Sequence, residues 1–169
     1  LSIHSFPTRR SSDLAVAAAM AQACSEIALY PDASSLTLRT ALSKKLGVPG
    51  NQLVFGNGSE DLLSIVSRVF LDRGDEVVTV VPFFCLHFIY PMAAGARVVG
   101  VPMTADGAFD VAAMIAALTP RTRLLMFSCP SNPVGSTLNA DELQQLLAAL
   151  PAYCLLVLDE AYYEYAQHE

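Results

Sequence analysis

The chain has 169 residues, of which 53% are apolar and 15% charged, with 10 lysines and arginines against 16 aspartates and glutamates. This composition is typical of a folded domain with a substantial core and excludes an intrinsically disordered chain. The net charge of −6 argues against a nucleic-acid or anionic-membrane partner. The longest uncharged run, 77–96, contains Pro82 and Pro91, so it predicts a strand and a helix and not a membrane span.

The first 14 residues and the cysteines bear on where in the cell the protein is located. Residues 1–14 differ in character from the rest of the chain and predict a foreign or unstructured leader; two arginines with no apolar run before them do not make a secretory signal. The four cysteines are widely spaced within apolar stretches, which predicts buried, reduced thiols and a cytoplasmic location. They are Cys24, Cys85, Cys129 and Cys154.

The first predicted elements are helices at 14–30, which the turn at Pro31 stops, and at 35–46, which Gly47 ends. Beyond them, short apolar runs alternate with helical segments, as in a chain of βαβ units. Strands are predicted at 52–55, 76–81, 97–101, 124–128 and 154–159.

Helical periodicity supports the segments between the later strands. Four apolar side chains from Val111 to Leu118 and four from Leu143 to Leu150 each predict one buried stripe. Asn139 with Glu142 predicts a capping box at the start of the second helix. The fold class is therefore α/β, a mostly parallel doubly wound sheet, with ligand chemistry expected in loops at the carboxyl ends of the strands.

The loop after the first predicted strand contains Gly56 and Gly58 and opens a helix with Ser59, Glu60 and Asp61. A glycine turn at a helix N-terminus presents free backbone amides to a phosphate, but it is equally the pattern of a tight turn capped by Ser59. The spacing fits neither the dinucleotide-binding nor the Walker fingerprint. In a phosphate site both carboxylates must face solvent.

Three further loops come after predicted strands. Phe83 and Phe84 follow the second strand, where one ring can stack on a flat heteroaromatic ligand or both can be core residues; His87 nearby is by itself weak support for a site. Asn132 lies between two prolines, which suits a rigid amide that binds a ligand oxygen or a simple proline turn. Asp159 ends a buried strand, where its carboxylate needs a cation or strong donors unless it caps a helix.

These features, with LYPD at 29–32 and DEAYYEY at 159–165, resemble in order and spacing the fold-type I pyridoxal-phosphate enzymes of aminotransferase class I and II over about 27–165. The resemblance makes 15–169 part of a large domain that binds pyridoxal 5′-phosphate. It implies a homodimer that moves an amino group from glutamate, the small-molecule donor, to a keto-phosphate acceptor, with no metal.

The resemblance also implies roles for individual residues. The amides of Gly58, Ser59 and Glu60 would hold the cofactor phosphate, and Phe84 would stack on the pyridine ring.

Four more residues complete the implied cofactor site. Asn132 and Tyr162 would hydrogen-bond the 3-hydroxyl oxygen, and Asp159 would keep the pyridine nitrogen protonated. Tyr30 would reach the phosphate in the neighbouring subunit.

The Schiff-base lysine of the family is missing. Lys44 and Lys45 are the chain's lysines and lie on an early helix, where solvated charge is the expected role, so a truncated and inactive fragment is predicted. His87 stands where many family members have tyrosine, which leaves open a related class I/II aminotransferase or an amino-acid-phosphate decarboxylase. A non-catalytic binding module without the lysine is the alternative from another class.

Overall fold

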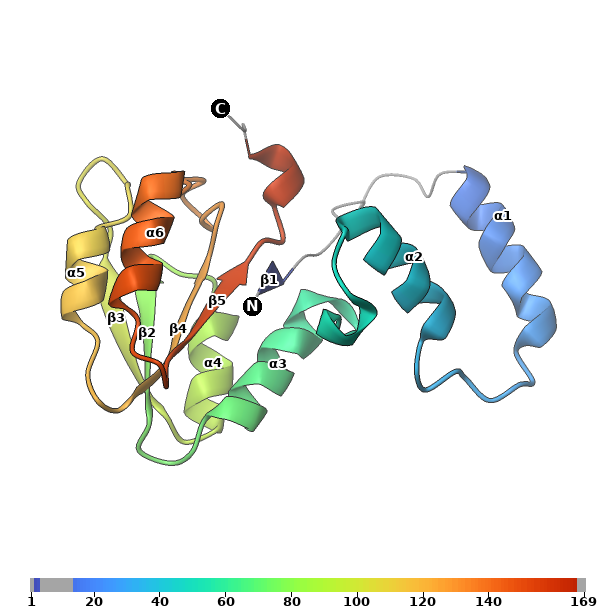
Figure 1. Ribbon diagram of the computed structural model, residues 1–169, viewed down its shortest axis with the longest axis horizontal. Helices are drawn as coiled ribbons and strands as arrows, with labels where there is room; N and C mark the ends of the chain where they lie inside the picture. Colours follow the sequence, from blue (N-terminus) through green and yellow to red (C-terminus); the bar gives the residue numbers. More distant parts are fainter. Residues whose placement is uncertain (1, 4–13, 167–169) are drawn as a thin grey trace. The chain divides into compact units, whose positions relative to one another are not determined.

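The computed structural model describes residues 2–3 and 14–166 (Figure 1). They divide into two compact units that are described separately. The α/β unit contains residues 57–166 together with 2–3, and the helical segment contains residues 14–56.

The α/β unit is built on a five-stranded sheet of order β1-β5-β4-β2-β3 in which every pair of neighbouring strands is parallel. The strands are β1 (Ser2–Ile3), β2 (Glu76–Val81), β3 (Arg97–Pro102), β4 (Thr122–Ser128) and β5 (Leu155–Asp159). The four strands predicted from 76 onward are confirmed to within about two residues at either end. Their apolar runs are continuous because helices cover both faces.

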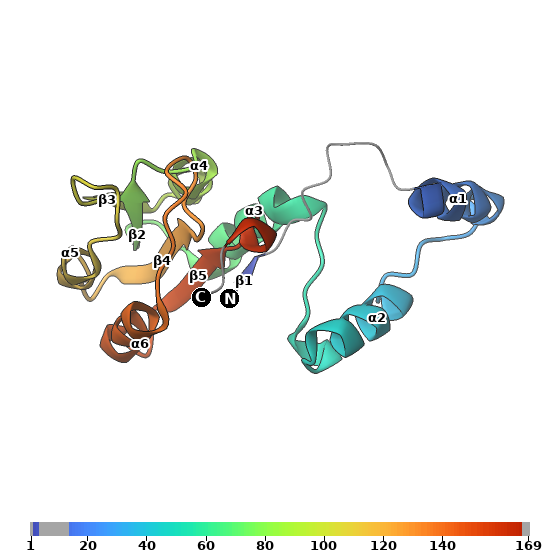
Figure 2. The same cartoon turned by 90° about the horizontal axis from the view of Figure 1, so that it is seen from above.

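Helices α3 (Gly58–Phe70) and α4 (Leu86–Ala93) cover one face of the sheet, while α5 (Val111–Ala116) and α6 (Ala140–Ala149) cover the other (Figure 2). Strand β2 alternates between the two cores: Val77 packs with the cluster beneath α3, and Val78 and Val80 pack with the cluster beneath α5 and α6. This arrangement confirms the predicted doubly wound α/β fold.

The strand order reverses at β2, which has β3 on one side and β4 on the other. In open parallel sheets such a reversal leaves a crevice between the carboxyl ends of the two adjacent strands, here β2 and β4, because the loops that follow these strands lead away from each other. The loops after β2 and β4 therefore flank a position suited to a ligand.

The predicted strand at 52–55 is wrong. Gly50–Gln52 form a 3₁₀ turn, and Leu53 has extended backbone angles but no neighbouring strand. Its carbonyl accepts a hydrogen bond from Nη1 of Arg39 at 2.6 Å, as does the carbonyl of Gly50. A side chain thus satisfies backbone groups that a sheet neighbour was expected to satisfy.

In the helical segment, α1 (Leu14–Ala23) is shorter than predicted and a 3₁₀ turn, Cys24–Glu26, follows it. Helix α2 (Leu36–Leu46) ends as predicted at Gly47, which has the left-handed φ of 69° that favours glycine. The segment buries none of its side chains from 14 to 56. Phe55, beneath the Arg39 guanidinium, is half-buried, but most apolar side chains of the segment are exposed.

Some side-chain predictions need correction. Cys24 and Cys85 are exposed, whereas Cys129 and Cys154 are half-buried, and burial raises the pKa of both of these thiols. In α6, Leu146 is buried, but Leu147 of the same predicted stripe is 46% exposed because the helix touches the sheet along a narrower face.

Of the predicted leader, Ser2 and Ile3 pair with Leu158 and Asp159 of β5, so these two residues have regular structure, and 4–13 lie outside the described residues. No helix in the described part of the chain is long and apolar enough to cross a membrane.

Candidate functional site at the carboxyl edge of the sheet

Asp159, the last residue of β5, lies at the carboxyl edge of the sheet and is 2% exposed. Its Oδ2 lies 3.1 Å from Nε2 of His87, which is itself 1% exposed, and its Oδ1 accepts the N–H of Ala161 at 3.2 Å. Within the described residues no arginine or lysine pairs with this carboxylate. A histidine ring and one amide therefore hold a buried carboxylate that retains capacity for a further donor.

Sequence reasoning assigned His87 no partner. The two residues are 72 positions apart, and they meet because α4 begins beside the carboxyl end of β5. The spacing of Phe84 and His87 within one helical turn was the available signal, since it places both near the start of the same helix.

The Asn132 loop continues from β4 beside Asp159. Ser128 lies opposite Asp159 in the ladder and its Oγ accepts the N–H of Asn132 at 2.8 Å. The N–H of Ser131 donates to the carbonyl of Ser136 at 2.8 Å, which closes the loop on itself. A short proline loop with these internal bonds holds Asn132 in one place, as its two flanking prolines predicted.

A pocket of about 580 Å³ opens next to this loop. Asn132 and Tyr162, predicted to act on the same ligand oxygen, both line it. Other lining residues are Pro130, Ser131, Pro133, Gly135, Thr137, Tyr165 and Ala166. The structure thus brings together two residues that are 30 positions apart in the sequence, although a role in binding stays a prediction.

Phe84 is half-buried and packs against the cluster beneath α3, so it is partly a core residue. Its ring meets the ring of His87 edge-on, with centroids 5.7 Å apart. Phe83 instead stacks on Phe88 at 5.5 Å. Of the two aromatic rings, Phe84 is therefore the one that lies against the His87–Asp159 pair.

The glycine turn leads into α3. Gly58 has a φ of 83°, and a Cβ there would meet no atom within 4 Å, so backbone conformation and not crowding favours glycine. Asn57 is the N-cap and makes no side-chain cap, so the turn is not one capped by Ser59. Helix geometry leaves the N–H groups of Gly58, Ser59 and Glu60 without partners inside α3.

The two carboxylates of this first turn have partners of their own. Oδ2 of Asp61 accepts the N–H of Asn57 at 2.9 Å, and Oε1 of Glu60 accepts the hydroxyl of Tyr90 at 2.7 Å. The bond to Glu60 raises the pKa of Tyr90. Glu60 is exposed, but the half-buried carboxylate of Asp61 folds back onto the N-cap N–H, so of the two only Glu60 meets the expectation that both face solvent.

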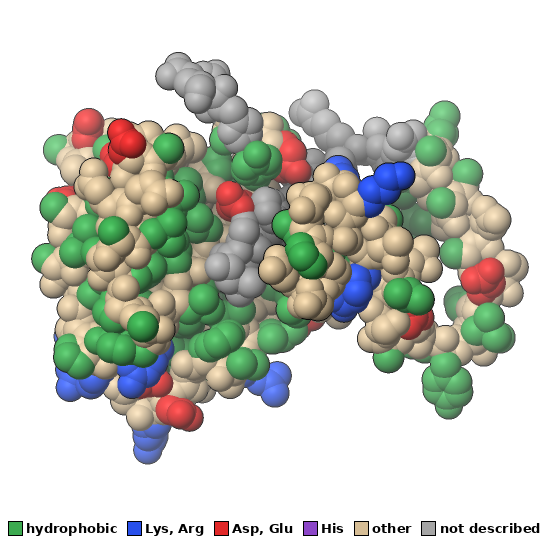
Figure 3. Space-filling view, in the orientation of Figure 1, with side chains coloured by type: hydrophobic (Ala, Val, Ile, Leu, Met, Phe, Trp, Pro, Cys, Tyr) green, Lys and Arg blue, Asp and Glu red, His purple; other side chains and the backbone are tan. Residues whose placement is uncertain are grey.

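The arginines of the α/β unit lie in the last turn of α3, in the turn before β2, or beside Asp75 and Glu76 at the amino end of β2, and Figure 3 shows blue groups along the lower edge of this unit. They are Arg68, Arg73, Arg97, Arg121 and Arg123. Residues 57–166 thus place no lysine or arginine at the carboxyl edge, so an anion bound at the start of α3 would be held by backbone N–H groups and the α3 dipole.

Tyr30 belongs to the helical segment and is fully exposed. Its predicted role stays untested by this single chain. Among the described residues, no three histidine, cysteine, aspartate or glutamate side chains gather as metal ligands would.

The family profile described as Aminotransferase class I and II matches residues 2–169, and the chain belongs to this family. It is 46% identical over 151 residues to histidinol-phosphate aminotransferase 1 of Mesorhizobium japonicum, which covers 89% of this chain and 41% of that protein. It is 45% identical over 136 residues to histidinol-phosphate aminotransferase 1 of Nitrosococcus oceani, which covers 80% of this chain and 36% of that protein.

Among solved structures, the histidinol-phosphate aminotransferase of Sinorhizobium meliloti in complex with pyridoxal-5′-phosphate superposes with a TM-score of 0.88 at 30% identity. The match covers 98% of this chain and 45% of that one. The chain therefore spans about two fifths of the length of its curated relatives.

Proposed function

We propose that the protein containing this chain is a pyridoxal-phosphate-dependent aminotransferase acting as a histidinol-phosphate aminotransferase in the cytoplasm, which transfers an amino group between glutamate and imidazole-acetol phosphate in histidine biosynthesis. Family membership and the names of the relatives support the class and the substrate. The observation that carries the proposal is the buried His87–Asp159 pair at the carboxyl edge of the sheet.

The residues present fit the cofactor. A carboxylate that is 2% exposed and is held by a histidine ring and one amide, with no lysine or arginine partner in the described residues, is suited to a protonated ring nitrogen as its third donor. Three N–H groups without partners inside α3 are suited to a phosphate on an edge that has no lysine or arginine of 57–166. When bound, pyridoxal phosphate supplies a ring that accepts electrons from the substrate carbon.

Each candidate site residue of the chain then has a separate proposed role. Asp159 would keep the ring nitrogen protonated, and His87, 3.1 Å from its Oδ2, would fix the orientation of that carboxylate. Phe84 would stack on the ring, and Asn132 and Tyr162, which line one pocket, would bind its oxygen substituent.

The α/β unit supplies no lysine at this edge. Lys44 and Lys45 both belong to α2 in the helical segment, and the α/β unit contains no lysine. We therefore propose that the proton transfers require residues beyond these 169, and that the chain alone is inactive.

A homodimer is the proposed assembly. The helical segment carries exposed apolar side chains such as Ile27 and Leu29, together with Tyr30, and buries none of its own residues. A second copy would cover these side chains and would receive Tyr30 at its phosphate site. Light scattering on the full-length protein is expected to give twice the mass of one chain, and a monomer that retains activity would contradict this assembly.

Asp159→Asn in the full-length protein tests the catalytic proposal. An amide cannot hold the ring nitrogen in its charged form, so we expect the turnover of glutamate with imidazole-acetol phosphate to fall by roughly a hundred-fold or more. Asp141→Asn, which removes an exposed carboxylate from the first turn of α6, is the matched control and is expected to keep full activity.

The activity of Asp159→Asn and the binding of pyridoxal phosphate distinguish an aminotransferase from a non-catalytic binding module. Activity of Asp159→Asn within about tenfold of the parent would contradict the site. A full-length protein that binds no pyridoxal phosphate, and has no lysine beyond residue 169, would favour the non-catalytic binding module instead.

A further inference from the structure

Glu60 lies at the third position of α3, where a glutamate ordinarily folds back onto the start of its own helix. Here the N–H of the N-cap Asn57 is already taken by Asp61. The carboxylate of Glu60 is bound instead by the Tyr90 hydroxyl, at 2.7 Å, from the neighbouring helix α4.

Tyr90 is well placed to hold this carboxylate still. Its half-buried ring packs against the apolar cluster beneath α3, which includes Leu63 and Val66. An anchored aromatic ring has few rotamers, so its hydroxyl stays at one position relative to α3.

A released Glu60 would have a different preferred place. The positive end of the α3 dipole and the free N–H groups of Gly58 and Ser59 attract any nearby carboxylate. No lysine or arginine of 57–166 lies at this edge to compete for it, and His87 is already bound to Asp159. Glu60 would therefore act as an internal anion at the place where a phosphate binds.

We propose that Tyr90 is a positioning residue that keeps the Glu60 carboxylate away from the phosphate-binding amides of Gly58 and Ser59. The inference rests on the proposed function, because it assumes that these amides bind a cofactor phosphate. Tyr90 itself acts through Glu60 and contacts no phosphate.

The test is a double-mutant cycle in the full-length protein with Tyr90→Phe, Glu60→Gln and the combined variant. The probes are pyridoxine 5′-phosphate and pyridoxine, which lack the aldehyde and so form no bond with lysines, and calorimetry measures both dissociation constants. Tyr153→Phe, which removes a tyrosine hydroxyl on the exposed side chain over Arg123, is the matched control.

We expect Tyr90→Phe to weaken binding of pyridoxine 5′-phosphate about five-fold and to leave pyridoxine unchanged, because a freed charge repels only the phosphate. In the Glu60→Gln background the same change is expected to have no effect. Glu60→Gln preserves side-chain length, and affinity restored in the combined variant relative to Tyr90→Phe supports the tether. If Tyr90→Phe folds poorly, Glu60→Gln alone is the second variant: it keeps Tyr90 and is expected to bind pyridoxine 5′-phosphate at least as tightly as the parent, and weaker binding would contradict the tether.

Two results would overturn the inference in distinguishable ways. Equal weakening by Tyr90→Phe with glutamate or glutamine at position 60 would mean that Tyr90 only packs α4 against α3. If the unmodified protein binds pyridoxine 5′-phosphate no better than pyridoxine, the phosphate cradle itself is absent, and the proposed site fails together with the tether.

Discussion

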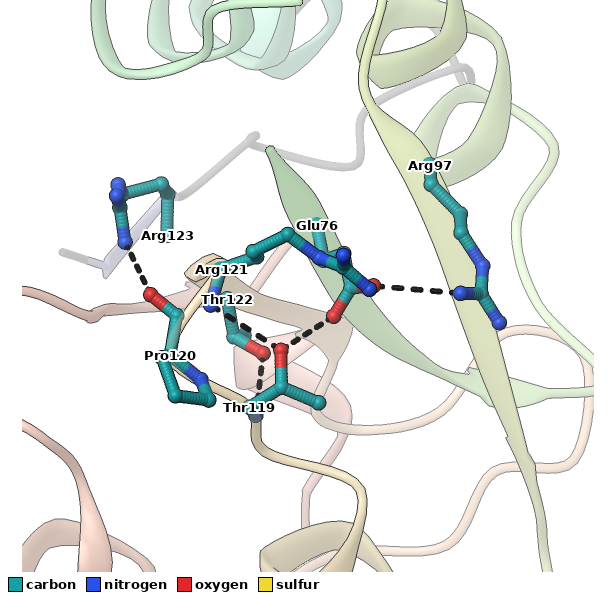
Figure 4. Close-up of polar contacts among 7 residues, drawn as sticks. All are labelled: Glu76, Arg97, Thr119, Pro120, Arg121, Thr122 and Arg123. Atoms are coloured by element: carbon teal, nitrogen blue, oxygen red, sulfur yellow. Dashed lines mark hydrogen bonds and ion pairs between the residues drawn. The ribbon is translucent and has the colours of Figure 1, made fainter. Parts of the chain in front are cut away.

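Glu76 connects the amino ends of the central strands, at the edge opposite the candidate site. It is the first residue of β2 and is 2% exposed (Figure 4). Its Oε1 lies 2.8 Å from Nη2 of Arg121 and 3.3 Å from Nη1 of Arg97, and its Oε2 accepts the hydroxyl of Thr119. One carboxylate thereby joins β2, β3 and the turn before β4.

The change Glu76→Gln keeps the shape of this side chain and removes its charge. Hydrogen bonds to a charged group contribute about 1.5–3 kcal/mol each, while solvent screens pairs whose partners are exposed. The side chains of Arg121 and Arg97 are 64% and 68% exposed. We therefore expect the free energy of unfolding to fall by about 2 kcal/mol.

The pH dependence has a defined sign. The Thr119 hydrogen bond, and after it the hydrogen bond from Arg121, lower the pKa of Glu76 in the folded chain. Its contribution to stability is therefore fully present above the ordinary glutamate pKa and is lost as pH falls through the lowered folded-state pKa. Glu76→Gln should flatten this acid-side loss of stability.

Urea denaturation followed by circular dichroism, at pH 7 and at steps below pH 5, measures both effects. Arg97→Ala is the control: the Arg97 side chain is exposed and Arg121 and Thr119 still hold Glu76, so we expect a loss of less than about 1 kcal/mol. A Glu76→Gln variant within about 0.5 kcal/mol of the parent at pH 7 would refute the reasoning, since that is the usual scatter of surface substitutions.

Two further changes test the packing of the fold. Gly100→Ala on β3 would place a Cβ 2.6 Å from Cγ2 of Val81, a stiff side chain, so we expect a loss of about 1–3 kcal/mol in urea titrations; an unchanged midpoint would show that the edge strand moves freely. Asn139→Ala removes the side chain that caps α6 through Glu142, for an expected loss of about 1 kcal/mol, whereas Asn139→Asp should retain most of the stability; equal losses in the two variants would contradict the capping role.

Local signals in the sequence were sufficient for most elements. The capping box at Asn139 and the glycine stop at Gly47 are confirmed because both depend on residues within one turn of each other. The strands from 76 onward are confirmed because continuous apolar runs between turn residues have few other folded solutions. Once the strands were predicted, Asn132 and Asp159 could be chosen as candidate site residues because each follows the end of a strand.

The order of the strands and the partners across the site came only from the tertiary structure. Residues 52–55 are of types common in strands, yet the carbonyl of Leu53 accepts a hydrogen bond from Arg39 and not from a neighbouring strand. The local pattern of apolar residues does not indicate which of these partners the carbonyl will have. His87 with Asp159 and Tyr90 with Glu60 pair residues 72 and 30 positions apart. Such contacts depend on how α4 packs against α3 and the sheet, so the sequence determined which residues line the edge, and packing decided which of them touch.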